Sequence, residues 1–131
     1  MKMFYRLEGH TPVPVNSIME WAEWLEKADR KVAHNTINGV EVSTAFLGID
    51  HAFSSDRPLL FETMIFGGFY DGYQRRCSTW EDAEALHTEA LVLVLRWRLL
   101  PRWAQQFAED LWWFPVKLLR RAEALKAQMG G

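Results

Sequence analysis

The chain has 131 residues, which is enough for one domain with a single hydrophobic core. Hydrophobic residues make up 49% of the chain and aromatic residues 14%, a composition that excludes an intrinsically disordered protein. The formal charge of −2 argues against a generally basic nucleic-acid binder, and the single cysteine, Cys77, excludes an intrachain disulfide and a cysteine metal cluster.

The amino-terminal part of the chain predicts a strand, an extended connection and a helix. We expect Met3–Leu7 to form a strand at a sheet edge. Prolines restrict the following segment, residues 10–14, to extended or turn conformations. Ser17-Ile18-Met19-Glu20 matches a capping box and should begin the helix. One apolar stripe then has helical spacing: Ile18, Trp21, Leu25 and Ala28.

The strongest short-range signal is a β-hairpin centred on Asn38-Gly39. Both residues readily adopt the positive φ that a two-residue turn requires. The flanking runs Lys31–Ile37 and Val40–Leu47 should therefore pair as antiparallel strands. Alternation in the second run places four side chains on one face, namely Val40, Val42, Thr44 and Phe46.

A further strand is predicted over Leu59–Phe66, after a loop over residues 48–58 that is rich in glycine, serine, aspartate and proline. Glu62 is a carboxylate within this mainly apolar strand. Gly67-Gly68 predicts a bulge or a turn, and Tyr73–Cys77 predicts a short last strand.

A second helix is predicted from a capping box at Ser78-Thr79-Trp80-Glu81 to about Arg98. We interpret His87 as a core histidine with hydrogen-bond partners, and Cys77 as an inert, partly buried thiol. The expected buried face of the helix is Trp80, Ala83, His87, Ala90, Val94 and Trp97.

The carboxy-terminal tail reads as two more helices, Arg102–Phe114 and Val116–Gln128, separated by a proline. The order of elements predicts an α+β domain over residues 1–97, in which an antiparallel sheet of four to five strands carries two helices on one face. A Trp-rich basic helical extension follows over residues 98–131. The domain has 9 Lys or Arg against 14 Asp or Glu, whereas the extension has 6 against 3.

Three segments of the chain resemble a widespread family of small phage and prophage proteins. They are VSTAFLGIDHAF, RPLLFETMIFGG and RRCSTWEDAEALH, and the upstream run WAEWLEKADRKVA is similar to the family's first helix. The resemblance covers roughly residues 3–92. It departs from the pattern at Cys77, where Tyr is expected, and at Leu86, where Gly is expected. It implies a phage genome or a prophage and supplies no activity.

The best polar constellation joins Asp50 and His51 in the loop with Glu62 on the next strand. A histidine beside carboxylates can act as a general base or hold a metal, and together with Arg75 these residues could form a pocket for a small ligand or nucleotide. The structural alternative is that Asp50 caps the turn, His51 ties the loop to the sheet, and Glu62 pairs with Arg75 or Arg76. Because the spacing matches no metal-binding motif, we expect no metal, no cofactor and no catalytic residue.

Aromatic residues and arginines gather in the tail and favour an interface there. The alternatives are packing on the chain's own sheet, a homodimer through the C-terminal helices, a foreign protein partner, and a membrane surface. Glu109 and Asp110 count against the membrane surface. The candidate interface residues are Trp97, Trp103, Phe107, Trp112, Trp113 and Phe114.

Met1-Lys2 is followed by a mixed segment, and the longest apolar run of the domain, Ala90–Leu95, is too short to span a membrane. We therefore expect a cytoplasmic protein. The resemblance to the phage family, together with the lack of a catalytic motif, implies a phage or prophage accessory protein that binds a host or phage protein, with action against host defence as one such role. One alternative is a small-ligand or nucleotide-binding protein, with or without weak hydrolase activity, that uses the Asp50, His51 and Glu62 region. Another is a virion or assembly component. DNA is not an expected partner.

Overall fold

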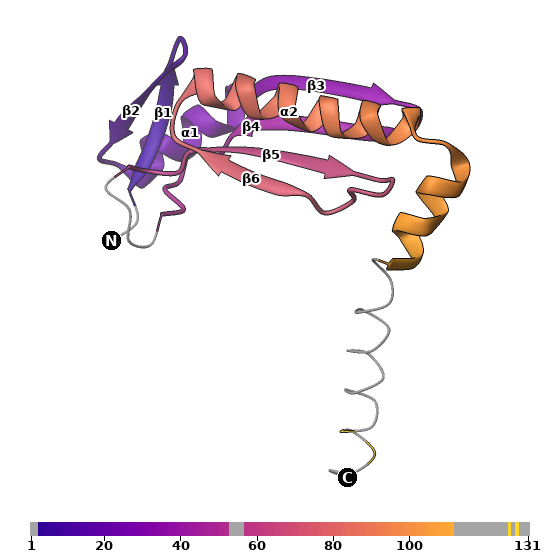
Figure 1. The fold of residues 1–131 in the computed structure, drawn as a ribbon. Helices are drawn as coiled ribbons and strands as arrows, with labels where there is room; N and C mark the ends of the chain where they lie inside the picture. The colour runs from indigo at the N-terminus through magenta and orange to yellow at the C-terminus, as the bar shows by residue number, and fades with distance from the viewer. Residues whose placement is uncertain (1–2, 53–56, 112–125, 127, 129–131) are drawn as a thin grey trace. The chain divides into compact units, whose positions relative to one another are not determined.

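The computed structural model describes residues 3–52, 57–111, 126 and 128 (Figure 1). The chain divides into two compact units, residues 1–94 and residues 95–131. In the first unit, a four-stranded and a two-stranded antiparallel sheet combine with helices. The predicted α+β class is therefore confirmed.

The larger sheet is a meander whose four antiparallel strands lie in chain order. Its strands are β3 (Lys31–Ile37), β4 (Val40–Phe46), β5 (Phe61–Phe66) and β6 (Gln74–Cys77). β3 and β6 are the two edges of this sheet. The predicted pairing of residues 31–37 with the strand that begins at Val40 is confirmed.

Two turns connect these strands as the sequence indicates. Asn38 and Gly39 form the β3–β4 turn with φ values of 46° and 80°. After β5, the Gly67 N–H donates to Asp71 Oδ1 at 2.7 Å, which closes the turn that contains Gly67-Gly68. A Cβ atom on Gly68 would lie only 2.9 Å from a methyl group of Val40, so a side chain has no room there.

The amino-terminal segment forms a separate hairpin instead of an edge of the larger sheet. β1 (Phe4–Glu8) pairs antiparallel with β2 (Thr11–Val15), a segment that the sequence predicts only as extended or turning. The two prolines of β2, Pro12 and Pro14, occupy alternate positions of the register. At these positions the backbone nitrogen points away from β1, so the prolines remove no hydrogen bond from the pair.

Gly48 marks the place where β1 meets the larger sheet. Its carbonyl accepts the Tyr5 N–H at 2.8 Å, and its φ of 80° is in the left-handed region that favours glycine. A Cβ atom at this position would lie 2.9 Å from Trp21 Nε1. Both the backbone conformation and the close approach of the indole therefore require glycine.

α1 (Ile18–Lys27) begins where the sequence predicts. The Ser17 Oγ accepts the Glu20 N–H at 3.3 Å, which satisfies one of the donors at the helix N-terminus. Trp24 packs edge-to-face on Phe46 with ring centroids 5.8 Å apart. This contact holds α1 on the inward face of β4.

α2 (Trp80–Leu99) covers the same face of the sheet (Figure 1). Thr79 Oγ1 accepts the Asp82 N–H at 3.1 Å, so the cap is Thr79 and the predicted start at Ser78 is wrong by one residue. The predicted inward stripe is confirmed at four positions, because Ala83, His87, Ala90 and Val94 are buried.

Two apolar clusters form the core between α2 and the sheet. One joins Val42 and Ile65 of the strands to Ala90 and Val94 of the helix. The other contains Phe46, Leu60, Phe61 and Ala83, with Trp24 and Trp80 packed against it. Because burial of apolar side chains is the main favourable contribution to folding, these two clusters stabilise this unit.

The second unit contains the last residues of α2 and a helix over residues 102–111. Gln105 Nε2 donates to the carbonyl of Trp97 at 2.8 Å and to that of Leu100 at 3.2 Å, so its amide caps the end of α2. The predicted helix end at Phe114 lies outside the described residues, as does most of Val116–Gln128, of which residues 126 and 128 are helical. Within the described part of the chain, no helix has the length and apolar character needed to cross a bilayer.

Candidate functional site

The loop that carries Asp50 and His51 is held by backbone hydrogen bonds. Asp50 Oδ1 accepts the N–H of Ala52 at 2.8 Å and the N–H of Leu59 at 3.0 Å, so the carboxylate bridges the two ends of the loop. The His51 N–H donates to the Leu59 carbonyl at 3.1 Å. The Asp50 carboxylate and the His51 backbone therefore close the loop next to β5.

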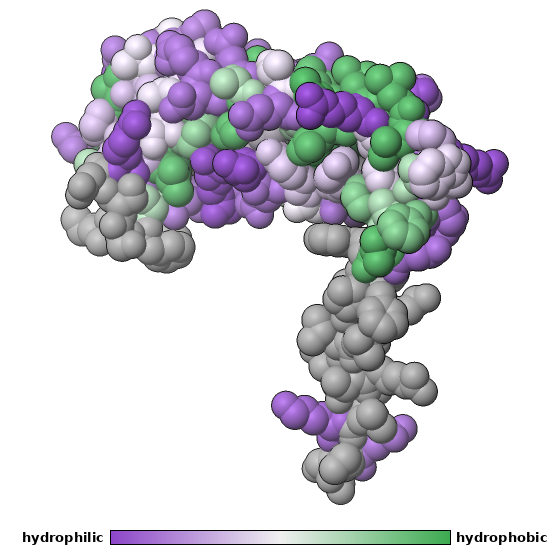
Figure 2. All heavy atoms as spheres, viewed as in Figure 1, coloured by the Kyte–Doolittle hydropathy of each residue, from purple (hydrophilic) through white to green (hydrophobic). Residues whose placement is uncertain are grey.

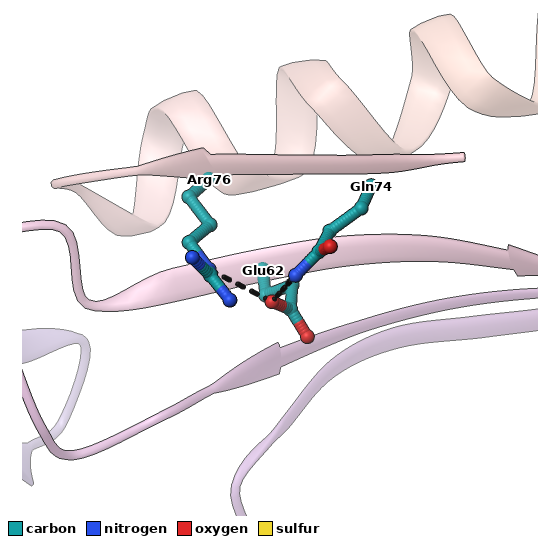
Figure 3. A network of polar contacts seen from close by, with 3 residues as sticks. All are labelled: Glu62, Gln74 and Arg76. Carbon is teal, nitrogen blue, oxygen red and sulfur yellow. Dashed lines mark hydrogen bonds and ion pairs between the residues drawn. The ribbon is translucent and has the colours of Figure 1, made fainter. Parts of the chain in front are cut away.

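Glu62 lies on the face of the sheet that α2 leaves uncovered. Its Oε2 atom accepts from Arg76 Nε at 2.9 Å and from the Gln74 amide, and both partners come from β6 (Figure 3). The register places Glu62 opposite Arg76, which is why the pair forms directly across two strands. The Glu62 side chain is only 15% exposed, so the guanidinium provides the counter-charge that a half-buried carboxylate needs.

Arg75 lies on the opposite face of the sheet from Glu62. It pairs in register with Thr63, which is buried beneath α2. Successive side chains of a strand point to opposite faces, so Glu62 and Arg75 cannot line the same pocket. The structure therefore brings Glu62 together with Arg76. The predicted pocket that includes both Glu62 and Arg75 does not form.

A groove with a volume of about 270 Å³ lies between β6 and α2. The strand contributes Arg75, Arg76 and Cys77, and the helix contributes the remaining lining residues, Asp82, Ala85, Leu86 and Glu89. Burial, and to a lesser extent the negative charge of Asp82, raises the pKa of the Cys77 thiol to about 11. The thiol is thus protonated and unreactive at neutral pH, in agreement with its interpretation as an inert group.

A chain of buried hydrogen bonds connects α2 to the middle of the sheet. Thr63 Oγ1 lies 2.7 Å from Thr44 Oγ1, which in turn lies 2.7 Å from His87 Nδ1. On the other side of the ring, His87 Nε2 donates to Asn35 Oδ1 at 2.8 Å. The neutral imidazole then accepts the Thr44 hydroxyl proton at Nδ1.

Burial lowers the pKa of His87 below its ordinary value, and repulsion from His34 lowers it further. The side chain is 4% exposed, and Thr44 and Thr63 are fully buried. No substrate can reach these hydroxyl groups, so the network fixes the position of α2 on the sheet. The prediction that His87 is a satisfied core residue is confirmed, whereas the partner Asn35 gave no signal in the sequence.

The candidate interface residues of the tail are only partly described. Trp97 is half-buried, whereas Trp103 and Phe107 are 75% and 62% exposed. The remaining three candidates, Trp112, Trp113 and Phe114, lie outside the described residues.

Among the described residues, no group of three or more His, Cys, Asp or Glu is arranged to hold a metal ion. Comparison of the chain with protein-family models, with curated proteins and with solved structures finds no match.

Proposed function

We propose that this chain is a small phage or prophage accessory protein, located in the cytoplasm of a bacterial host, that acts by binding a host or phage protein. The phage context rests on the three sequence segments that resemble the phage family. The binding role is supported by one observation. Six of the eleven large hydrophobic side chains that are exposed among the described residues lie within residues 95–111.

The exposed side chains of the helix over residues 102–111 form a stripe. Trp103, Phe107 and Leu111 follow one another at four-residue spacing and are 75%, 62% and 60% exposed. Figure 2 shows hydrophobic surface along this helix. Burying each of these side chains in an interface would contribute about 1.5–3 kcal/mol, so the stripe favours a partner that covers it.

The chemistry around the stripe suits a protein partner. Trp103 follows directly after Arg102, and tryptophan and arginine are the residues that most often dominate the energetics of protein interfaces. Glu109 and Asp110 add negative charge to the same helix, which disfavours an anionic lipid surface. A protein groove that accepts an amphipathic helix satisfies both features.

The polar candidates of the first unit support binding over catalysis. The Asp50 carboxylate accepts two backbone N–H groups, and the Glu62 carboxylate is engaged by Arg76 and Gln74. A general base or a nucleophile needs an accessible lone pair directed at a substrate. In each residue one of the two carboxylate oxygens, Asp50 Oδ1 and Glu62 Oε2, already accepts two hydrogen bonds that stabilise the fold.

Affinity capture from a bacterial host lysate, followed by mass spectrometry, tests the proposal. The full chain should retain one protein in stoichiometric amount, and the double substitution Trp103→Ser with Phe107→Ser should lose it. Met19→Ser is the matched control, because Met19 is 70% exposed on α1 and outside the stripe. If all three proteins capture the partner equally, the stripe is not part of the binding site. If none of them captures a protein, the binding role is contradicted.

A further inference from the structure

The outer edge of β6 offers hydrogen-bonding groups to a further strand. The Tyr73 carbonyl accepts the Ile65 N–H at 3.1 Å, and the Cys77 carbonyl accepts the Leu60 N–H at 2.9 Å, so these carbonyls point toward β5. Backbone groups alternate in direction along a strand, and those of Gln74 and Arg76 therefore point away from the sheet. In the described part of the chain no strand pairs with this edge.

The groove between β6 and α2 lies beside this edge. A strand added next to β6 would direct every second side chain into the groove, against the face of α2 that carries Leu86. The volume of about 270 Å³ suits one or two side chains, and Ala85 is the small residue of the helix wall. Asp82, Ala85 and Glu89 are exposed, so the wall is accessible along its length.

The charges along the groove define the side chain that it fits. The helix wall carries two carboxylates, Asp82 and Glu89, with the apolar Leu86 between them. On the strand wall, the Arg76 guanidinium is already paired with Glu62 on the other face of the sheet. Arg75 therefore supplies the positive charge that this wall presents to the groove. The groove therefore keeps an excess of negative charge, and the surrounding domain of residues 1–97 is acidic as well, with 14 Asp or Glu against 9 Lys or Arg.

We propose that β6 and α2 form a docking site for an extended basic peptide segment of a partner protein. The peptide main chain pairs with the outward N–H and C=O groups of Gln74 and Arg76. A lysine or arginine of the peptide enters the groove, lays its aliphatic stem on Leu86 and places its cationic head between Asp82 and Glu89. This site lies within residues 1–94 and goes beyond the binding role proposed for the helix over residues 102–111.

Selection from a library of random nonapeptides displayed on phage, with the full chain as bait, tests this site. Selected peptides should contain lysine or arginine at one position, with strand-forming residues around it. A synthetic copy of the selected peptide should bind about tenfold more weakly to the double variant Asp82→Asn with Glu89→Gln. The matched control, Glu81→Gln with Glu84→Gln, removes the same charge from the other side of α2 and should leave the affinity unchanged.

Methylation of the peptide nitrogens distinguishes strand addition from simple charge attraction. A peptide with N-methyl groups on the residues whose N–H groups face β6 should not bind. A peptide with N-methyl groups on the intervening residues should bind almost as well as the unmodified peptide. Amide NMR shifts should change at Gln74–Cys77. The proposal would be overturned if no sequence is enriched, if acidic peptides are enriched, or if both methylated peptides bind equally well.

The same selection with the Trp103→Ser and Phe107→Ser bait separates this site from the proposed function. If the enriched peptides are unchanged, the groove acts independently of the stripe. If the enrichment disappears with this bait, the selected peptides bind the stripe and the groove proposal is wrong. Loss of peptide selection together with intact capture of a lysate protein would contradict only the groove.

Discussion

Among the described residues, the two units differ in where their large hydrophobic side chains lie. In residues 1–94, Phe46, Phe61 and Ile65 are fully buried between the sheet and α2. In residues 95–131, Leu99 and Trp103 are 85% and 75% exposed. The first unit uses apolar area for its own stability, and the second presents apolar area that a partner can cover. Substitutions should therefore affect unfolding in the first unit and recognition in the second.

The largest loss of stability is expected for Phe46→Ala, since Phe46 joins α1 to the core through Trp24. Removing a fully buried phenylalanine should lower the free energy of unfolding by about 3–5 kcal/mol. Phe66→Ala on β5 is the control, because Phe66 is 44% exposed and should cost far less. Urea unfolding followed by circular dichroism measures both. Equal losses would show that burial does not separate these two positions.

A smaller loss is expected for Thr44→Val, which keeps the shape of the side chain and removes its hydroxyl. His87 Nδ1 and the Thr63 hydroxyl then lose their partner inside the core. Leaving such groups unpaired should lower the free energy of unfolding by about 2–3 kcal/mol. Thr36→Val, at an exposed position of β3, should change it by less than about 0.5 kcal/mol. A neutral Thr44→Val would mean that the hydroxyl chain does not stabilise the domain.

His87 should make the stability of the first unit depend on pH. Burial and the nearby His34 lower the pKa of His87 in the folded state from its ordinary value of 6.5. The unfolded chain therefore binds a proton more readily as the pH falls below 6.5, and stability is lost from there down to the folded pKa. The slope should not exceed about 1.4 kcal/mol per pH unit. Urea unfolding of the wild type and of His87→Gln across this range should differ in slope, and parallel curves would exclude His87 as the source.

A small loss of stability is also expected for Glu62→Gln. The substitution removes the ion pair with Arg76 but keeps an oxygen that can accept from Gln74. Partly exposed ion pairs contribute little, so the free energy of unfolding should fall by less than about 1 kcal/mol. Thermal or urea unfolding at low and high salt measures this, and the difference from wild type should shrink as salt rises. A loss as large as that of Phe46→Ala would mean that the ion pair contributes as much stability as a buried core side chain.

The sequence predicted the features that depend on local patterns. Asn38-Gly39 specifies its turn because both residues tolerate positive φ, and the inward stripe of α2 follows from helical spacing alone. The pairing of β1 with β2 was not predicted, since Pro12 and Pro14 usually argue against a strand. Their alternate placement in the register makes them harmless, and this depends on which partner strand they meet.

The candidate site was less predictable because it depends on which residues face each other across strands. The sequence predicts that Glu62 pairs with Arg75 or Arg76. The strand register, which places Arg76 directly opposite Glu62, selects Arg76. Asn35 meets His87 from a strand 52 positions away in the sequence, which no local pattern indicates. The groove between β6 and α2 likewise depends on a helix that lies beside a sheet edge with which no described strand pairs.

The contrast between the two units is tested most directly by photo-crosslinking in bacterial cells. A photoreactive phenylalanine analogue replaces Phe107 in one protein and Met19 in another, since both side chains are well exposed. We predict that position 107 crosslinks to one foreign protein and that position 19 does not. Crosslinks from position 107 only to a second copy of this chain, or equal crosslinks from both positions, would contradict it.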